Sequence, residues 1–441
     1  MRNTKLFKIA ILMIAFLTIF CLASCAINNG KSAYEIAVEN GYNGTQSQWL
    51  NSLQGNNGAD ASKITIEEIY QEAQEKGYEG SFLDFLKEYL SFNTYEDTSY
   101  ATNKALLNVV SISVTHKKSG SLFFGGTYSS AGSGVIYHLD KAAGNAYIIT
   151  NYHVLYDTNS NTVDGIGETI KVFLYGMEYE DYAINASYVG GSMTYDIAVL
   201  KVEGSSVLQN SAAFAAVVGD SDNVAVGQTV LAVGNPEAEG LSVTKGILSV
   251  DSEYITMKGA DNLTELEFRV MRVDTGINAG NSGGGLFDAR GKLLGIVSAK
   301  VVDEGVEAMG YVIPSVVATR VADKIIDNGR LNKCMLGITI TSIDSKAVFD
   351  TENQTTHIEE TIKIQSVAQG SLAYSVLMAD DILVSVKVND GTMMPIKRTF
   401  NVVDTVLMCN VGDKIIFSLL RNGQAQEVEI TFTAESLTQV N

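Results

Sequence analysis

The sequence predicts a mostly β protein: two β-barrels, followed by a smaller α/β domain and preceded by small helical repeats. From about Thr98 to Val312, short apolar segments alternate with turns rich in glycine, asparagine and serine, a pattern expected for two six-stranded barrels, with Leu106 to Val114 as the predicted first strand. After the barrels, Pro314 starts a predicted helix over Ser315–Asn328 that Gly329 closes. Residues 335–433 mix such strands with a predicted amphipathic helix, Thr399 to Cys409, and a two-residue hairpin turn at Asn422-Gly423, which indicates an α/β module. At 441 residues and 46% hydrophobic content, the chain has the length for about three domains and enough apolar side chains for their cores.

Residues 1–25 are predicted to be a signal segment. Three basic residues precede a 14-residue, largely apolar run, which is shorter than the roughly 20 residues that span a bilayer. The run ends in Leu22-Ala23-Ser24-Cys25, which resembles a bacterial lipoprotein signal. That resemblance implies cleavage before Cys25, lipid attachment to it and a firm membrane anchor. An ordinary secretory signal with an incidental cysteine is the alternative.

Residues 26–97 contain two similar segments, 33–53 and 69–89, at a period of 36 residues. Each is predicted to form a helical hairpin in which a glycine ends the first helix and Thr45 or Ser81 caps the second. The hairpins resemble short repeated modules of bacterial surface proteins, whose role is open. A spacer that lifts the rest of the chain off the membrane and a wall- or partner-binding module are both compatible with the pattern.

The predicted barrels contain a serine surrounded by glycines, in Gly280-Asn281-Ser282-Gly283-Gly284. A nucleophilic serine needs such a stretch, because the backbone must turn sharply and a substrate carbonyl must come close to backbone N–H groups. The Gly280-Asn281-Ser282 segment is therefore the predicted oxyanion hole, with the N–H groups of Gly280 and Ser282 as donors.

Two more segments supply partners for this serine. His153 follows an apolar strand, and Asp196 opens another, where a carboxylate can orient an imidazole. The order His153, Asp196, Ser282 is that of chymotrypsin-type enzymes and differs from the order in subtilisins and α/β-hydrolases. The chain's other histidines, His116, His138 and His357, adjoin no motif and are predicted to lie at the surface or in loops.

The chain now resembles the HtrA/DegP-type serine proteases, which have a trypsin-like double β-barrel followed by a PDZ domain. The matching segments occur in the family's order: Gly132-Ser133-Gly134-Val135-Ile136, TNYHVL (150–155), YDIAVLKV (195–202), VGNP (233–236), INAGNSGGGL (277–286) and GYVIPS (310–315). Gly285 stands where the family usually has proline. Asn281 precedes the serine where digestive relatives have aspartate, so a freed N-terminus has no partner and ordering of loops is the expected form of control.

The resemblance implies a protease domain over residues 98–331 and a PDZ domain over residues 332–441. It further implies cleavage of unfolded or misfolded proteins outside the cytoplasm, after small aliphatic residues, and assembly into a homotrimer. The substrate pocket should be formed by four mostly small or apolar residues, with no carboxylate to receive Lys or Arg: Val297, Ser298, Ala299 and Met309.

In the C-terminal domain the order of elements resembles a circularly permuted bacterial PDZ domain. Leu336-Gly337-Ile338 would then bind a peptide's C-terminal carboxylate through backbone N–H groups while the peptide adds as a strand. Two features depart from that pattern: Asp380 stands where glycine is usual, and residues 345–360 form a long polar insertion.

Composition excludes several classes of partner. The net charge of −19 argues against binding to a phosphate backbone, so no nucleic-acid partner is expected. No pair of histidines or cysteines has metal-ligand spacing, so neither a metal nor a cofactor is predicted. Whether Cys334 and Cys409 pair is open from sequence.

Two alternatives to proteolysis remain. One is a non-catalytic chaperone or peptide-binding scaffold at the cell surface, and the other is an adhesion protein whose repeats carry the main role.

Overall fold

The computed structural model describes residues 98–440 apart from 118–125, 163, 299–308 and 352–353, and, N-terminal to these, only residues 38, 70, 71, 73 and 74. The predictions for the signal segment, Cys25, the two repeats and Ala299 concern residues outside those described. Contacts divide the chain at residue 96 into an N-terminal unit and a unit that holds everything from Asp97 onward. In the described part of the chain, no helix combines the length and apolar character needed to cross a membrane.

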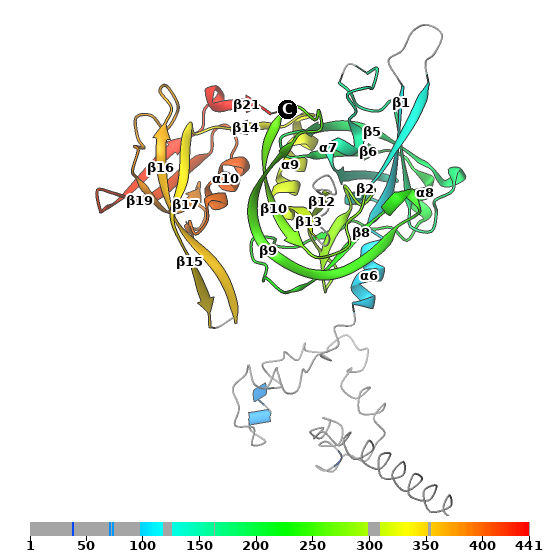
Figure 1. Cartoon of the computed structure of the whole chain (residues 1–441), viewed down its shortest axis with the longest axis horizontal. Helices are drawn as coiled ribbons and strands as arrows, with labels where there is room; N and C mark the ends of the chain where they lie inside the picture. Colours follow the sequence, from blue (N-terminus) through cyan, green and yellow to red (C-terminus); the bar gives the residue numbers. More distant parts are fainter. Residues whose placement is uncertain are drawn as a thin grey trace, which may run out of the picture. The chain divides into compact units, whose positions relative to one another are not determined.

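The first barrel is closed and has six strands in the order β1-β2-β3-β6-β5-β4 (Figure 1). Its interior is filled by β-branched and other aliphatic side chains that alternate with outward-facing residues along each strand, as a half-buried strand requires. Its strands are β1 (Val109–Lys117), β2 (Thr127–Asp140), β3 (Asn145–Thr150), β4 (Thr169–Leu174), β5 (Ile184–Ser192) and β6 (Ile197–Val202). The short helices beside it are α7 (Tyr152–Leu155), η1 (Glu180–Tyr182) and α8 (Ser206–Asn210).

The second barrel follows the strand path β11-β8-β9-β10-β13-β12, and pairing of β11 with β12 joins the two ends of that path. The prediction of two six-stranded barrels therefore agrees with the structure, except that a short seventh strand adds in parallel to β12. The strands are β7 (Val217–Val218), β8 (Thr229–Gly234), β9 (Ser242–Lys258), β10 (Glu265–Val273), β11 (Gly285–Asp288), β12 (Lys292–Ser298) and β13 (Gly310–Pro314), with η2 (Pro236–Ala238) after β8.

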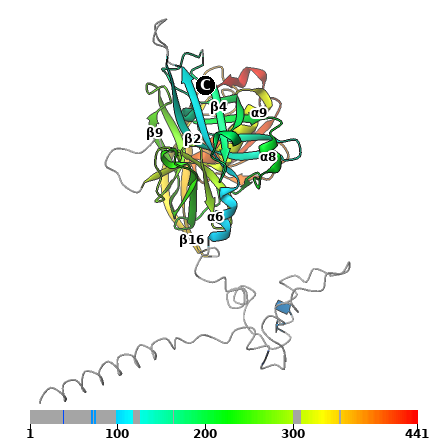
Figure 2. The ribbon, with the colours of Figure 1, turned by 90° about the vertical axis from the view of Figure 1, so that its right-hand side faces the viewer.

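Two helices cover the junction of the barrels. α6 (Ser99–Leu106) packs against β1 of the first barrel and β8, β9 and β11 of the second (Figure 2). α9 (Ser315–Asn328) crosses β5 and β6 of the first barrel and β12 and β13 of the second, and it ends at Gly329, as predicted. The prediction that the first strand begins at Leu106 was wrong, because Leu106 ends a helix whose apolar face enters the core between the barrels.

The C-terminal domain is a sheet in the order β15-β16-β17-β19-β20, with α10 packed on it. The predicted amphipathic helix and the Asn422-Gly423 hairpin turn are both present, and these two turn residues have φ of 52° and 77°. The predicted polar insertion forms the outer part of the β15–β16 hairpin. The elements are β14 (Asn332–Cys334), β15 (Ile338–Asp350), β16 (Thr355–Val367), β17 (Ile382–Val388), β18 (Met394–Pro395), α10 (Thr399–Met408), β19 (Lys414–Arg421), β20 (Gln424–Thr431), η4 (Ala434–Ser436) and β21 (Leu437–Gln439).

Candidate active site

The structure brings three side chains that are far apart in the sequence into one hydrogen-bonded row. His153, on α7, has Nε2 2.9 Å from Ser282 Oγ and Nδ1 2.8 Å from Asp196 Oδ2. Because Nδ1 faces a carboxylate, it carries the proton, and Nε2 is left to accept the serine hydroxyl proton. The row contains a nucleophile, a base and an orienting acid in the geometry that covalent catalysis requires.

The carboxylate of Asp196 has hydrogen-bond partners besides the imidazole of His153. Asp196 lies just before β6 in the left-handed region, with φ 50°, and only 5% of it is exposed. Its Oδ1 also accepts the backbone N–H of His153 at 3.1 Å, and its Oδ2 accepts the hydroxyl of Ser298 at 3.3 Å. The side-chain amide of Asn151 holds the Asp196 carbonyl at 2.8 Å. These bonds give the buried carboxylate hydrogen-bond donors on both oxygens and hold it in place.

The glycine-rich loop before β11 turns as the sequence predicted. Gly280 and Gly283 have φ of 94° and 84°, a region open to glycine and unfavourable for other residues. The backbone N–H of Asn281 donates to the Asn278 carbonyl at 3.0 Å. Asn281 therefore shapes the turn, and the N–H groups of Gly280 and Ser282 stay the candidate oxyanion donors.

Ser133, on β2, fixes this loop through hydrogen bonds. Ser133 Oγ donates to the Gly280 carbonyl at 2.7 Å and accepts the N–H of Asn235 at 2.8 Å. Its own N–H donates to the Ser282 carbonyl at 2.8 Å. One residue of the first barrel thus ties together two loops of the second, so the oxyanion loop is positioned before any substrate arrives.

The open cleft above these residues has a volume of about 450 Å³. Its wall is formed by α7 and the segment after it, by the start of β2, by Ala260 and Asn262, and by Ala279 and Gly280. Three predicted pocket residues are not in that wall. Val297 packs inside the second barrel, Ser298 faces Asp196, and Met309 lies 3.6 Å from the guanidinium of Arg272. The predicted substrate pocket, which would hold the residue before the cleaved bond and is called the acyl-side pocket below, stays a prediction.

The predicted carboxylate loop of the C-terminal domain precedes β15. Leu336 is buried and its carbonyl accepts the N–H of Ala373 at 3.2 Å, while Gly337 has φ 78°. A small groove of about 150 Å³ runs between Leu336-Gly337-Ile338 and the valines of α10. Asp380, which replaces the usual glycine, has φ 69°, so it keeps the left-handed turn that glycine would make.

Sequence reasoning missed the roles of Ser298, Asn151 and Ser133, although Asn151 and Ser133 stood within the quoted motifs. The prediction that His116 lies at the surface or in a loop was wrong: it is 1% exposed on β1, and its Nε2 lies 3.3 Å from Ser130 Oγ. Of the other two histidines, His138 is exposed and His357 is partly exposed. The period-two pattern could have found His116, because Val110, Ile112 and Val114 point to the same face of β1. Burial lowers the pKa of His116.

Comparison with known proteins gives concordant results. A model of the trypsin-like peptidase domain matches residues 132–296. Among curated proteins, the serine protease Do-like HtrA of Bacillus subtilis is 30% identical over 73% of this chain and 69% of its own length. Do-like HtrB of the same organism is 32% identical over 69% of this chain and 62% of its own length, and the periplasmic pH-dependent serine endoprotease DegQ of Escherichia coli is 29% identical over 69% and 59%.

Among solved structures, the HtrA-type protease AlgW with a tripeptide has a TM-score of 0.51 at 24% identity, covering 78% of this chain and 97% of the other. This likeness bears on the fold. It supports the path of the chain through both barrels and the domain that follows them.

Proposed function

The chain belongs to the HtrA family of trypsin-like serine endopeptidases, and we propose that it cleaves peptide bonds through Ser282, His153 and Asp196. His153 takes the hydroxyl proton as Ser282 Oγ attacks the carbonyl carbon, and it then gives that proton to the leaving amine. Asp196 orients the imidazole and stabilises its protonated form. The unbroken row of hydrogen bonds from Asp196 to Ser282, at 2.8 and 2.9 Å, is the observation that carries this proposal.

The oxyanion of the tetrahedral intermediate is bound by the N–H groups of Gly280 and Ser282. Two hydrogen bonds from Ser133 support a preformed loop. Removal of one donor in such a site typically costs about 10²–10³ in rate.

Replacement of Ser282 by alanine tests the proposal. We expect the Ser282→Ala protein to lose activity on reduced, unfolded casein by a factor on the order of 10⁴ or more, because the covalent intermediate cannot form. Ser366→Ala, on an exposed position of β16, is the matched control and should retain full activity. Undiminished cleavage by Ser282→Ala would remove this serine from the mechanism. Labelling of Ser282 by an organophosphonate separates the protease from a non-catalytic chaperone or scaffold.

The proposed substrates are unfolded or misfolded proteins outside the cytoplasm, cut after small aliphatic residues, and the proposed role is protein quality control in the envelope. The acyl-side pocket is assigned to Val297, Ser298, Ala299 and Met309, among which no carboxylate could pair with Lys or Arg. Small aliphatic residues are buried in folded proteins, so unfolded chains would expose them. A peptide library that shows preference for Arg or Lys before the cut would contradict this assignment.

The C-terminal domain is proposed to be a PDZ domain that binds peptide C-termini at Leu336-Gly337-Ile338. The left-handed Gly337 and the groove beside α10 support this. Fluorescence anisotropy with peptides that end in a free carboxylate or in an amide tests it, and equal affinity for the two would overturn it.

Export and assembly complete the proposal. DegQ of Escherichia coli is named as periplasmic, which supports export of this chain as well. We expect a lipid anchor at Cys25 that holds the protein on the outer face of the cell membrane, and a homotrimer. The Cys25→Ala variant should move from the detergent phase to the aqueous phase in a partition assay, and sedimentation of the detergent-solubilised protein gives its oligomeric state.

A further inference from the structure

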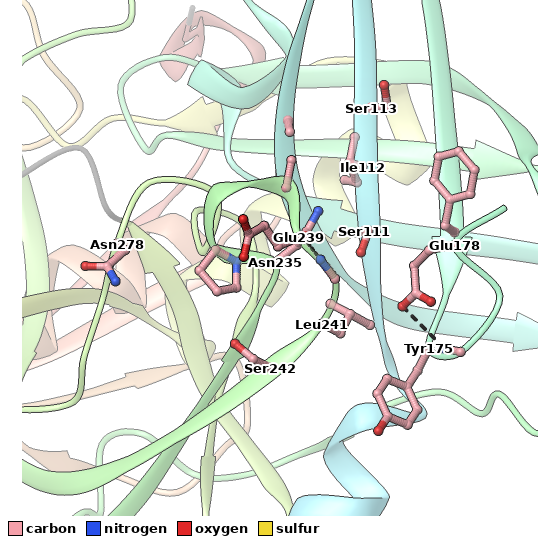
Figure 3. Close-up of a pocket in the computed structure, with 16 residues that line it drawn as sticks. Ser111, Ile112, Ser113, Tyr175, Glu178, Asn235, Glu239, Leu241, Ser242 and Asn278 are labelled. Carbon is pink, nitrogen blue, oxygen red and sulfur yellow. Dashed lines mark hydrogen bonds between the residues drawn. The ribbon is translucent and has the colours of Figure 1, made fainter. Parts of the chain in front are cut away.

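A second and larger hollow lies next to the catalytic cleft. It has a volume of about 940 Å³ and shares Ala131 with the cleft, and Asn278 of the oxyanion loop lines it (Figure 3). Its other walls come from β1, the end of β4 with the turn after it, and the segment from Asn235 to Ser242. None of the residues assigned to the acyl-side pocket lines this space, which we call the lateral groove.

The position of the lateral groove relative to Ser282 determines which half of a substrate could enter it. Val297 and Ser298, at the end of β12, belong to the predicted acyl side. The lateral groove meets the cleft at Ala131 and continues towards β1 and β4, and no residue of β12 lines it. Because a substrate passes Ser282 in an extended form, its leaving segment has to continue away from β12 and towards this groove.

The edge of β2 at the mouth of the groove can pair with such a segment. Ser133 directs its N–H away from β1 and onto the Ser282 carbonyl. Residues two apart on a strand direct their backbone groups to the same edge, so Ala131 also presents its N–H and C=O away from β1. β3 pairs with β2 from Val135 onward and therefore leaves this edge uncovered at the exposed Ala131. An extended leaving segment could add there as a short strand.

The groove is acidic and has one unmet hydrogen-bonding group. Among its described lining residues, the charged side chains are two exposed glutamates, Glu178 after β4 and Glu239 after η2 (Figure 3). Ser111, on β1, is 5% exposed, and its hydroxyl has no hydrogen-bond partner within the described part of the chain. Tyr175 and Leu241 supply apolar surface, along which the methylenes of a long basic side chain can pack.

We propose that the lateral groove binds the leaving side of the substrate and that Glu178 and Glu239 favour lysine or arginine within the first three residues after the cleaved bond. The inference rests on the proposed hydrolysis at Ser282. An extended chain rises about 3.3 Å per residue, so only residues that follow closely after the cleaved bond can lie in the groove that adjoins the cleft. The basic group then meets two carboxylates and no cation of the described lining.

The test uses full-length protein and internally quenched peptides that share one acyl half, with valine before the cut, and carry lysine, alanine or glutamate at the second and third positions after it. At low salt we expect kcat/KM for the lysine peptide to exceed that for the alanine peptide by roughly threefold to tenfold, with the glutamate peptide slower still. At about 0.5 M salt the ratio should fall towards one, because solvent-exposed charges are then screened.

The double variant Glu178→Gln/Glu239→Gln should bring the lysine-to-alanine ratio to about one. Glu265→Gln/Glu435→Gln changes the net charge equally at two exposed positions outside the groove and should leave the ratio as it is. Equal rates for the lysine and alanine peptides, or an unchanged ratio in the groove variant, would overturn the inference. In those cases Ser282-dependent cleavage of the alanine peptide would still uphold the proposed hydrolysis, whereas absence of all cleavage would overturn both.

Discussion

At the scale of single residues, the site depends on how Asp196 is held. Its carboxylate is almost fully buried and accepts bonds from the imidazole, from a backbone N–H and from the hydroxyl of Ser298. A buried carboxylate without such donors would be strongly destabilised, and its side chain would rotate towards other donors. The orientation of His153 therefore depends on residues that never touch a substrate carbonyl.

The Ser298→Ala variant tests this dependence. Loss of the hydroxyl removes one donor to a charged acceptor at a long distance of 3.3 Å, which should lower kcat about fivefold to tenfold because the imidazole is held less firmly. Steady-state kinetics on a valine peptide measures it, with Ser345→Ala on the β15–β16 hairpin as the control. A change in KM with kcat intact would mean that Ser298 acts only through the proposed substrate pocket and not through Asp196.

At the scale of elements, the loop from Asp274 to Gly284 is held by contacts between the two barrels. Gly283 packs so closely that an added Cβ would lie 2.1 Å from the carbonyl oxygen of Ser133 and 2.3 Å from Thr150 Oγ. Its N–H donates to the Val297 carbonyl at 2.9 Å. The glycine thus meets two demands, a left-handed backbone and close approach of β2 and β3.

The Gly283→Ala variant should therefore cost more than backbone strain alone. We expect a loss of about 3 kcal/mol or more in the free energy of unfolding, together with loss of activity, because β2 has to move. Gly204→Ala is the matched control: Gly204 also has a left-handed φ, 63°, but has open space around it, so about 1 kcal/mol is expected. Thermal unfolding of both variants gives the comparison, and equal losses would contradict the close-approach argument.

At the scale of the whole unit from Asp97 onward, the second barrel and the C-terminal domain share a buried charged contact. Arg269, on β10, pairs with Asp404 on α10 and with Asp222, and its guanidinium lies 3.6 Å from the ring centre of Phe400. Arg320, on α9, donates to the Asp404 carbonyl at 3.1 Å. This contact fixes α10, and with it the groove beside Leu336-Gly337-Ile338, against the barrels.

The contact should respond to pH. Burial, with Asp222 nearby, raises the pKa of Asp404 to about 6 although Arg269 and Arg320 act to lower it. The folded protein then binds a proton between about pH 4 and 6 that the unfolded chain does not bind, so the stability contributed by Asp404 is greatest below about pH 4 and is lost as the pH rises through about 6.

Thermal unfolding of the wild type and of Asp404→Asn from pH 4 to 7 measures this contribution as the difference between the two proteins. The advantage of the wild type should shrink with rising pH by on the order of 2–3 kcal/mol. The exposed Asp390→Asn should show no such trend. An advantage that instead grows with pH would mean that Asp404 is ionised throughout and is stabilised by Arg269.

Much of the fold could be predicted because the information for it is local. Alternation of apolar residues predicted the barrel strands, a proline followed by fourteen helical residues and Gly329 predicted α9, and Asn422-Gly423 predicted a hairpin. The first strand was misplaced because the apolar residues at 105 and 106 suit a helix face and a strand equally well.

The sequence by itself determined the candidate nucleophile, base and acid, their order along the chain and the left-handed turns around the serine, since these depend on residue type and close neighbours. Only the tertiary structure decided that Ser298 faces Asp196, that Ser133 joins two loops, that Arg269 is buried against α10 and that an acidic groove adjoins the cleft. Each of these contacts joins residues that are distant in the sequence, and such contacts follow from strand register and barrel closure, which no local pattern specifies.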